Sequence, residues 1–520
     1  MTHTDINKHQ FSHFILKIEE GVIKIPKFQR KYVWTKKQAA SLLDSIFRGL
    51  PVGVATIWRT NYEMKTLRGI GGFSFPNPQP LNSIDYVLDG QQRLTSLYCA
   101  LNGLKVITGK KEEDFSEIYV NLDAVGMDQI VYTSTDDLQQ GKFIKVCELY
   151  KFSINVIARY DETLFSILQT YSDRLKTYNF GAIILEGASL EEATLAYERA
   201  NTEGKKLDPF EVMIAHTFKE GVFDLEEQAA EFLSQLKERQ YNTIKHNTLL
   251  YTVSTILTKE CTSKAIYSIQ KDDFIKIWPK AMDALAYAVD FLRNDLKIKV
   301  SSILPYDYLL VPLAYFFYHH GMINNIKTQA LLQDFFWKTA LSERYTAGQP
   351  SKIAQDIIKI EKIMAGEQPE YDSPIVNPEF IKEKGRNFDP KKALHKTFLC
   401  LLASKSPMRL NTGADVVLDN SNLKSKNSKN YHHFYPKAFL KDKVNSSEIN
   451  HICNIVLLDA YTNQEIIRDK SPNVYMDEFE LSQNKLDSHL IPEIYDDYKA
   501  FINARAELLA SEFNKVLLLT

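Results

Sequence analysis

The stretch that decides the fold is YVLDGQQRLTSLY, residues 86–98. It opens with the apolar run of a short β-strand and continues from Arg93 as an amphipathic helix that stops at Asn102-Gly103. Asp89 and Gly90 stand at the turn between them. Backbone N–H groups at a helix start, with Arg93 beside them, form a natural anion pocket, and Gly90 lets a phosphate approach the backbone closely. The alternative is that Asp89 only caps the helix and the glutamines are solvated, and the spacing does not decide between the two.

The residues before this stretch also alternate helices with strands. Thr35 and Gln38 predict a capping box, and Gly49 predicts the end of that helix. VATIWRT after it is typical of a strand, and GGFSFPNPQPLNS (71–83) is predicted to be a loop because it contains three closely spaced prolines. The first 220 or so residues therefore predict a mixed α and β domain.

Bulk composition limits the remaining possibilities. A chain of 520 residues is too long for one hydrophobic core, so two or three domains are expected. The net charge of −2 excludes a global basic field, so a site for a polyanion must be a local patch. The five cysteines have no paired spacing, which suits a reducing cytoplasm. The most apolar run, YDYLLVPLAYFFYHH from Tyr306, is too short to span a bilayer and predicts a buried helix, so we expect a cytoplasmic protein without a membrane partner.

Long helical periodicity replaces this pattern from about residue 225 to 365. Its clearest helix carries one apolar stripe, formed by Ala281, Leu285, Ala288, Val289 and Leu292. The proline-rich segment 366–380 is the best linker candidate. These features predict a domain over 1–225, a helical region over 226–375 and a third domain over 376–520.

Three stretches together resemble the N-terminal domain of GmrSD-type restriction systems. They are IPKFQRKYVW (25–34), the DGQQR turn, and YERANTEGKKLDPFEV (197–212), in the family's order. The resemblance implies a ParB/sulfiredoxin-like fold that binds and hydrolyses a nucleoside triphosphate, GTP, UTP or ATP. A P-loop is excluded as the source of that activity because no GxxxxGK[ST] loop is present. Matching this sequence to the family pattern implies a nucleotide pocket lined by Gln29, Arg30, Asp89, Gly90, Gln91, Gln92 and Arg93, with Arg199 and Asn201 nearby.

A second candidate site lies in SKNYHHFYPKAFLKDK, residues 428–443. A histidine pair and a proline are followed by Asn454, which leads an apolar strand-like run, and by Asn463. Hydrolysis of a phosphodiester needs a residue that holds a divalent cation against the phosphate and an imidazole that takes a proton from the attacking water. The alternative is a surface strand that carries two solvated rings.

The layout resembles an HNH (ββα-metal) nuclease, as found in the C-terminal domain of the same GmrSD-type enzymes. By that resemblance, His433 is the general base, His432 and Asn463 are ligands of Mg or Mn, and Asn454 fixes the intervening loop. Six lysines surround the pair, and we expect Lys424, Lys426, Lys429 and Lys437 to contact the DNA backbone. Lysines are also common in solvated loops, so the lysine patch alone is weak evidence for DNA binding.

Together the two resemblances predict an NTP-regulated, modification-dependent DNA endonuclease in anti-phage defence, in an α+β multi-domain chain. Its partner would be modified phage DNA, and a homodimer would allow both strands to be cut. Two rivals remain: a nucleotide-binding regulatory protein with an inactive nuclease, and an NTPase that acts in signalling or repair.

Overall fold

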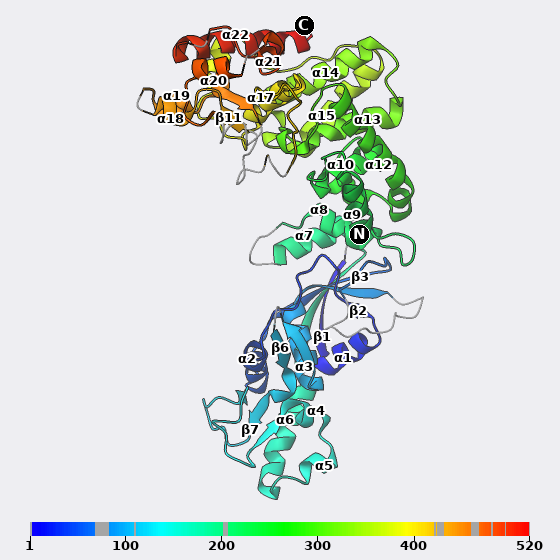
Figure 1. Cartoon of the computed structure of the whole chain (residues 1–520). Helices are drawn as coiled ribbons and strands as arrows, with labels where there is room; N and C mark the ends of the chain where they lie inside the picture. Colours follow the sequence, from blue (N-terminus) through cyan, green and yellow to red (C-terminus); the bar gives the residue numbers. More distant parts are fainter. Residues whose placement is uncertain are drawn as a thin grey trace. The chain divides into compact units, whose positions relative to one another are not determined.

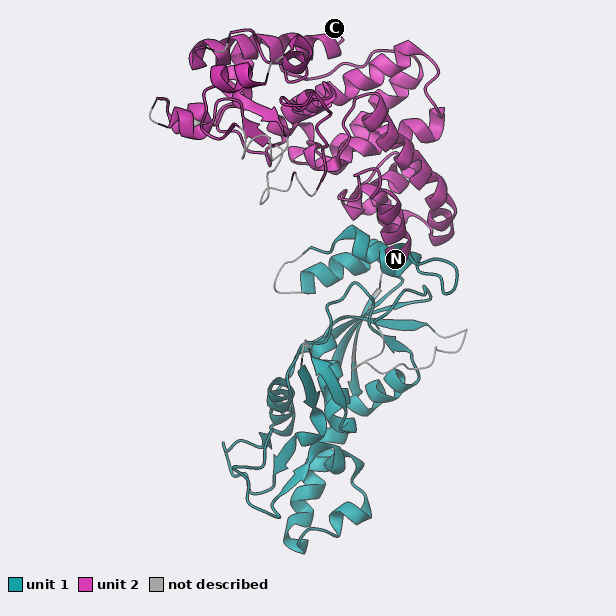
Figure 2. Cartoon of the chain, viewed as in Figure 1, with its two compact units in different colours: residues 1–225 teal, residues 226–520 magenta. Residues whose placement is uncertain are grey.

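The structure is a computed structural model, and it describes residues 3–67, 83–108, 111–200, 206–420, 423, 431–441, 443–458, 467–479, 482–494 and 496–518. The chain forms two compact units, Met1–Leu225 and Glu226–Thr520 (Figure 2). A mixed α and β, multi-domain protein is thereby confirmed. The further division of the second part at residue 375 stays a prediction, since 226–520 forms one compact unit.

A five-stranded mixed sheet organises the first unit, in the order β1-β10-β3-β4-β2. Figure 1 labels β1, β2 and β3 of this sheet. β10 lies antiparallel to β1 and parallel to β3, while β4 lies antiparallel to β3 and parallel to β2. The strands are β1 (His3–Gln10), β2 (Ile23–Lys24), β3 (Val54–Thr60), β4 (Ile84–Asp89) and β10 (Asn179–Glu186). The predicted strand VATIWRT is therefore confirmed as β3. The predicted proline-rich loop lies almost wholly outside the described residues.

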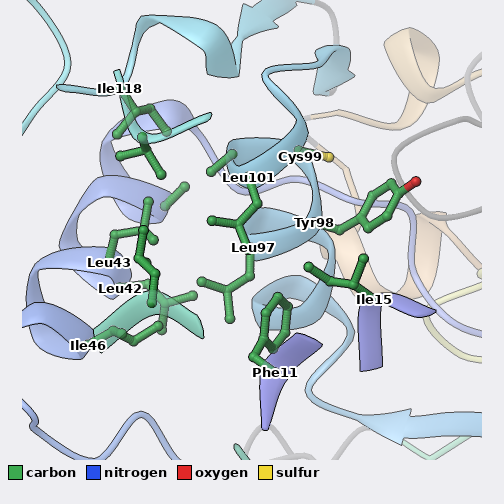
Figure 3. Packing of buried hydrophobic residues seen from close by; sticks show 14 of the residues in the cluster. Phe11, Ile15, Leu42, Leu43, Ile46, Leu97, Tyr98, Cys99, Leu101 and Ile118 are labelled. Atoms are coloured by element: carbon green, nitrogen blue, oxygen red, sulfur yellow. The ribbon is translucent and has the colours of Figure 1, made fainter. Parts of the chain in front are cut away.

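The predicted strand-turn-helix of 86–98 is confirmed as β4 followed by α3 (Gln91–Asn102). Gly90 occupies the N-cap with φ 91°, and Gly103 ends the helix with φ 61°. α2 (Lys36–Phe47) carries the predicted Thr35–Gln38 capping box. Its Leu42, Leu43 and Ile46 pack toward Leu97 and Leu101 of α3 (Figure 3). This apolar contact packs α3 against α2.

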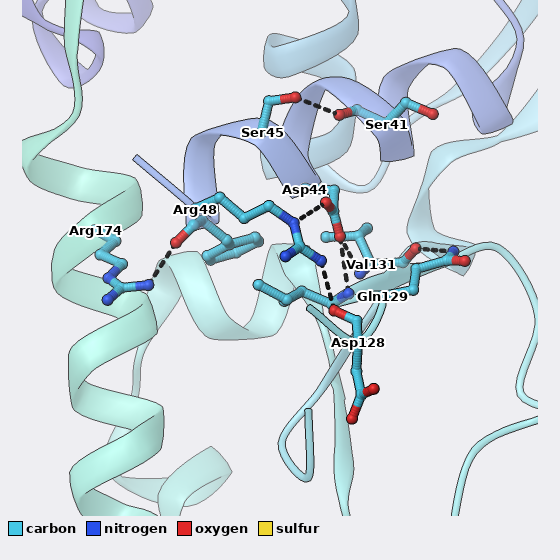
Figure 4. Close-up of polar contacts among 10 residues, drawn as sticks. Ser41, Asp44, Ser45, Arg48, Asp128, Gln129, Val131 and Arg174 are labelled. Carbon is cyan, nitrogen blue, oxygen red and sulfur yellow. Dashed lines mark hydrogen bonds and ion pairs between the residues drawn. The ribbon is translucent and has the colours of Figure 1, made fainter. Parts of the chain in front are cut away.

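A small three-stranded sheet, β8-β7-β9, continues the unit: β7 (Tyr119–Asn121), β8 (Val131–Tyr132) and β9 (Phe143–Lys145). Asp44 of α2 fastens to it, because its Oδ1 accepts from the backbone N–H groups of Ile130 (2.8 Å) and Val131 (3.3 Å) (Figure 4). The guanidinium of Arg48 reaches the carbonyl of Asp128 beside them (Figure 4). The other elements of the unit are α1 (Phe11–Glu19), β5 (Lys105–Thr108), β6 (Lys111–Asp114), α4 (Val146–Lys151), α5 (Ile154–Ile157), α6 (Phe165–Thr177), α7 (Leu190–Ala200) and α8 (Pro209–Thr217).

α7 packs against β3 and β4, the two strands that lead to the turn at Gly90. α8 begins with Asp208 as N-cap and Pro209 in the first turn. The carboxylate of Asp208 accepts from the N–H of Phe210 at 3.0 Å, one residue earlier than a capping box with Glu211 requires. Residues 201–205, between the two helices, lie outside the described residues.

Helices dominate the second unit. The predicted apolar stripe is confirmed, because all five of its residues are buried on α12. The predicted buried helix from Tyr306 is also confirmed as α13, which packs against α10, α12 and α15. None of the described helices combines the length and apolar character needed to cross a membrane. The helices here are α9 (Leu225–Gln235), α10 (His246–Thr258), α11 (Ser263–Ser268), α12 (Lys271–Asn294), α13 (Leu310–His320), α14 (Ile326–Leu341), α15 (Gln349–Met364), α16 (Pro378–Lys384) and α17 (Ala393–Ser404).

The last part of this unit contains a short antiparallel ribbon of β11 (Tyr431–His433) and β12 (Ile455–Leu457). Aromatic side chains form the core beside it, with the rings of Phe434 and Phe501 stacked at 4.8 Å between centroids. The linker candidate 366–380 is part of the compact unit, and its Val376 is buried. The remaining helices are α18 (Lys437–Leu440), α19 (Ser446–Ile449), α20 (Pro472–Glu478), α21 (Gln483–Asp487) and α22 (Tyr498–Val516).

Candidate functional site

The turn between β4 and α3 opens into a pocket of about 130 Å³. Seven of the nine residues predicted for nucleotide binding line it: Gln29, Arg30, Asp89, Gly90, Gln91, Gln92 and Arg93. Trp34, Leu88 and Tyr197 complete the lining and were not predicted. Arg199 is exposed on α7 and does not line the pocket, and Asn201 lies outside the described residues. The structure thus brings the first two predicted stretches together, and the third contributes through Tyr197.

Arg93 is a structural element of this pocket. Its guanidinium donates to the carbonyls of Val52 (2.9 Å) and Val54 (3.0 Å) and to the carboxylate of Asp89 (3.0 Å). These bonds tie the start of α3 to the chain entering β3. The proposal that Asp89 merely caps the helix is wrong, because the N-cap is Gly90 and Asp89 pairs with Arg93 instead.

Two glutamines join the 25–34 stretch to the turn. The side-chain oxygen of Gln92 accepts from the N–H groups of Val33 (2.9 Å) and Trp34 (3.3 Å). The side-chain amide of Gln29 donates to the carbonyl of Val87 on β4. Gln91 and Gln92 are 5% and 7% exposed, so the alternative of solvated glutamines is also wrong. Both stretches are needed to build one wall of the pocket.

The polar groups of this pocket that are not used in hydrogen bonds within the protein are groups that can bind an anion. Arg30 is exposed and, within the described residues, has no carboxylate partner. Gln91 is buried against the pocket, and its side-chain amide has no hydrogen-bond partner among the described residues. The first N–H groups of α3 have no competing side-chain cap. A ligand pocket usually measures about 300–1,000 Å³, so this space suits the phosphate end of a larger ligand.

The histidine pair lies on β11, where His432 faces Val456 and His433 faces Ile455 across the ribbon. His432 is 6% exposed and His433 is half-buried, so the alternative of two solvated surface rings is wrong. α20 follows the two strands in the chain, which gives the order strand, strand, helix. Asn463, the predicted distal ligand, lies outside the described residues.

Asn454 fastens the loop between the two strands. Its side-chain oxygen accepts from the N–H of Tyr435 at 2.8 Å, and its amide donates to the carbonyls of Tyr435 and Ile449, both at 3.1 Å. The residue is fully buried. These three bonds close the loop of 435–449 onto the end of β11.

His433 is oriented by Asn450, a residue that the sequence analysis missed. The Asn450 amide donates to the carbonyl of Phe388 at 2.7 Å, which leaves its oxygen facing His433 Nε2 at 3.1 Å. His433 therefore carries its proton on Nε2, and Nδ1 is left with a free lone pair. Burial, followed by the positive charge of Lys437, lowers the pKa of His433 to about 4. A neutral ring with a fixed tautomer is the form that accepts a proton.

Arg505 of α22 is a second residue that sequence reasoning missed. It is fully buried and donates to the carbonyls of Cys453 (2.7 Å), His489 (2.9 Å) and Leu490 (3.1 Å). Through Cys453 it holds the backbone next to Asn454. No spacing marks an arginine whose partners are carbonyls from distant parts of the chain, so the sequence gives no signal for it.

Comparison with known proteins assigns the first unit. Residues 11–218 match the family described as the GmrSD restriction endonuclease, N-terminal domain. This part of the chain belongs to that family. An uncharacterized protein of Methanocaldococcus jannaschii is 24% identical over 528 residues, which cover 91% of this chain and 87% of that protein. The similarity to this relative thus extends past the GmrSD domain into the second unit.

The GmrSD domain contains the whole pocket at the DGQQR turn, and the histidine pair lies beyond it. Membership in a restriction endonuclease family points to a nuclease and to DNA as its partner. Of the lysines predicted to contact DNA, Lys437 is exposed at the start of α18. Lys424, Lys426 and Lys429 lie outside the described residues.

Proposed function

We propose that this protein is an NTP-regulated, modification-dependent DNA endonuclease of anti-phage defence, with an HNH-type centre at His432 and His433. The observation that carries the proposal is the neutral His433 held by Asn450, in a chain whose N-terminal domain belongs to a restriction endonuclease family. The fold of that domain would be ParB/sulfiredoxin-like. A free Nδ1 near the exposed Lys437 suits proton abstraction next to a bound phosphate.

In the proposed reaction, His433 Nδ1 takes a proton from water while the water oxygen attacks the phosphorus. The bond from phosphorus to the leaving oxygen breaks, and the leaving oxygen is later protonated from solvent. Asn450 keeps the ring in the tautomer that accepts the proton. Asn454 keeps the loop that carries Asn450 against β11. Exposed Lys437 would hold a backbone phosphate near the ring.

The two proposed ligands, an imidazole and an amide oxygen, would suit a divalent cation that keeps much of its water. The described residues contain no group of three or more His, Cys, Asp or Glu side chains able to hold a metal. Mg usually binds through one or two protein groups plus substrate phosphates, and an imidazole ligand also suits Mn. His432 and Asn463 would hold the cation, which would stabilise the charge that develops on the phosphate.

The pocket at the DGQQR turn would bind the triphosphate of the nucleotide. Arg30, the Gln91 amide and the free N–H groups at the start of α3 are its available donors. Trp34 and Tyr197 also line the pocket and offer aromatic surfaces to the rest of the ligand. Nucleotide binding there would license cutting, which protects the host's own DNA.

The test compares cleavage of modified phage DNA with cleavage of matching unmodified DNA, with Mg or Mn and with or without NTP. We expect the wild type to cut only the modified DNA and to respond to NTP. His433→Ala should abolish cutting and leave NTP hydrolysis intact, whereas Arg30→Ala should weaken NTP binding. His246→Ala, at an exposed histidine of the same unit, serves as the matched control and should cut normally.

Unchanged cutting by His433→Ala would remove the nuclease assignment. Hydrolysis of NTP without cutting of either DNA would favour an NTPase of signalling or repair. NTP binding with neither activity would favour a regulatory protein whose nuclease is inactive. Because one such centre cuts one strand at a time, double-strand breaks by the wild type would point to a homodimer.

A further inference from the structure

The second unit contains a pocket of about 870 Å³ that is distinct from His432 and His433 and is lined by Tyr435, two residues beyond the pair. Its walls come from three places: the loop between His433 and Asn454, the end of α16 with the residues after it, and the start of α22. The volume falls within the range of pockets that enclose a small molecule or one unit of a polymer. The loop is the one that Asn454 closes onto β11, so the pocket and the His433 centre share a rigid wall.

Basic side chains without carboxylate partners line part of this pocket. Arg386, Lys441 and Lys499 are exposed, and no described carboxylate pairs with them. The ammonium of Lys443 lies 3.5 Å from the centroid of the Phe439 ring. Cations that are not neutralised by the protein are available to neutralise a phosphate backbone.

Aromatic rings line another part. Tyr435 is almost fully buried and meets Tyr498 edge to face, with 5.1 Å between ring centroids. Tyr498 is fixed because its hydroxyl donates to the carbonyl of Glu448 at 2.6 Å. Phe439 is half-buried beside Tyr435. Ordered rings at the edge of a basic pocket offer a surface on which a nucleobase can stack.

Carboxylates complete the lining and narrow the choice of ligand. Asp496 and Asp497 are exposed, and Asp497 caps α22 by accepting from the N–H of Ala500 at 2.8 Å. Carboxylates repel a ligand that consists only of phosphate, but they accept hydrogen bonds from amino and hydroxyl groups. The lining therefore suits a ligand with three parts: an anionic phosphate, a flat ring, and a polar edge that donates hydrogen bonds.

We propose that this pocket binds one nucleotide of the DNA strand, close to the phosphate that is cut. Its phosphate would lie on Arg386, Lys441 and Lys443, its base would contact Phe439 and Tyr498, and the base edge or sugar would reach Asp496 and Asp497. The proposal rests on the proposed nuclease function, and it adds a site that sets where the strand lies relative to His433.

The experiment measures binding of a fluorescent single-stranded DNA oligonucleotide to the full-length protein in EDTA, so that no cleavage occurs. Phe439→Leu should weaken binding at least about fivefold through loss of base stacking. Lys441→Ala and Arg386→Ala should each reduce the slope of log K against log salt by about 0.7. Lys280→Ala, at an exposed lysine of α12, is the matched control and should retain the wild-type slope.

Circular dichroism and thermal unfolding identify any variant that fails to fold, and the two basic-residue variants test the pocket without removing apolar packing. Wild-type affinity and salt slope in all three pocket variants would overturn the proposal. If they bind normally while the wild type cuts DNA in a His433-dependent way, the pocket fails and the nuclease stands. If they bind weakly while no cutting occurs under any condition, the nuclease fails and the pocket stands.

Discussion

At the scale of single residues, Asn450 determines which nitrogen of His433 carries the proton. The side-chain amide of Asn450 donates to the carbonyl of Phe388. Its side-chain oxygen therefore faces His433 and accepts a hydrogen bond from Nε2. A histidine that must act as a base gains from such a fixed partner, because the wrong tautomer presents N–H where a lone pair is required. Asn450 is a positioning residue, since it acts through the His433 ring.

We predict that Asn450→Leu lowers the DNA cleavage rate about 10- to 100-fold, as loss of an orienting partner commonly does. Asn450→Asp should recover most of the rate, because its carboxylate still accepts from His433 Nε2. Both variants lose the hydrogen bond to the Phe388 carbonyl, so both should lose about 1 kcal/mol of stability. They differ mainly in whether residue 450 can accept a hydrogen bond from His433. The measurement is single-turnover cleavage, with urea unfolding to compare stability.

A spectroscopic readout separates positioning from a structural defect. With ¹⁵N-labelled histidine, the Nε2–H tautomer of His433 should dominate in the wild type and in Asn450→Asp. It should be mixed in Asn450→Leu. Equal cleavage by the two variants, with an unchanged tautomer, would show that Asn450 does not orient the ring.

At the scale of elements, the turn from β4 to α3 depends on the missing side chain of Gly90. Its φ of 91° is costly for other residues, and a Cβ there would lie 3.2 Å from both the Cα and the Cβ of Ala55 on β3. The close approach of the turn to β3 also brings Asp89 and Arg93 together. Strand, turn and helix thus form one rigid wall of the pocket.

We predict that Gly90→Ala lowers the free energy of unfolding by about 1–3 kcal/mol and weakens NTP binding. Gly126→Ala is the matched control, since Gly126 also has positive φ (62°) but a Cβ there meets nothing within 4 Å. The control should lose only the cost of backbone strain, about 1 kcal/mol, and should bind NTP normally. Chemical denaturation and equilibrium NTP titration of both variants provide the measurements. Equal losses of stability with normal NTP binding would show that the approach to Ala55 is unimportant.

Element prediction succeeded where local signals were complete. Three features depend only on residues that are close together in the sequence. They are the capping box of α2, the glycines at the two ends of α3 and the apolar stripe of α12. The prediction that Gln29, Arg30 and the DGQQR turn form one pocket was based on the family resemblance. By contrast, Trp34 and Tyr197 line the pocket because of tertiary packing, which no local pattern encodes. The role of Asn450 was not predicted for the same reason. An asparagine in a loop has no sequence signature, because its partners His433 and Phe388 are brought to it only by the folded chain.

At the scale of the whole molecule, the second unit contains buried histidines whose pKa values are lowered. In the second unit, His489 is fully buried and donates from Nε2 to the carbonyl of Met408 at 2.6 Å. Burial lowers its pKa to about 4, and the positive charge of Arg505 adds to the effect. His451 of the same unit is also buried, and its pKa is lowered for the same main reason. In the first unit, His13 has a lowered pKa but is only partly buried.

Acid should therefore destabilise the second unit through these histidines. Since the pKa of His489 is about 4 in the folded state and about 6.5 when unfolded, the unfolded chain binds the proton first as pH falls. The stabilisation is complete above pH 6.5 and is lost progressively toward pH 4. Between pH 7 and pH 5, His489 alone should cost about 2 kcal/mol. Urea unfolding at the two pH values, with proteolytic fragments assigned to each unit, measures the loss.

His489→Gln provides the decisive comparison, because a glutamine amide can still donate to the Met408 carbonyl but does not titrate. This variant should start with similar or slightly lower stability at pH 7 and lose about 2 kcal/mol less than the wild type on going to pH 5. The first unit should show the same small change in both proteins. A wild-type loss that persists unchanged in His489→Gln would place the acid sensitivity at other groups, and a loss confined to residues 1–225 would contradict the assignment to the second unit.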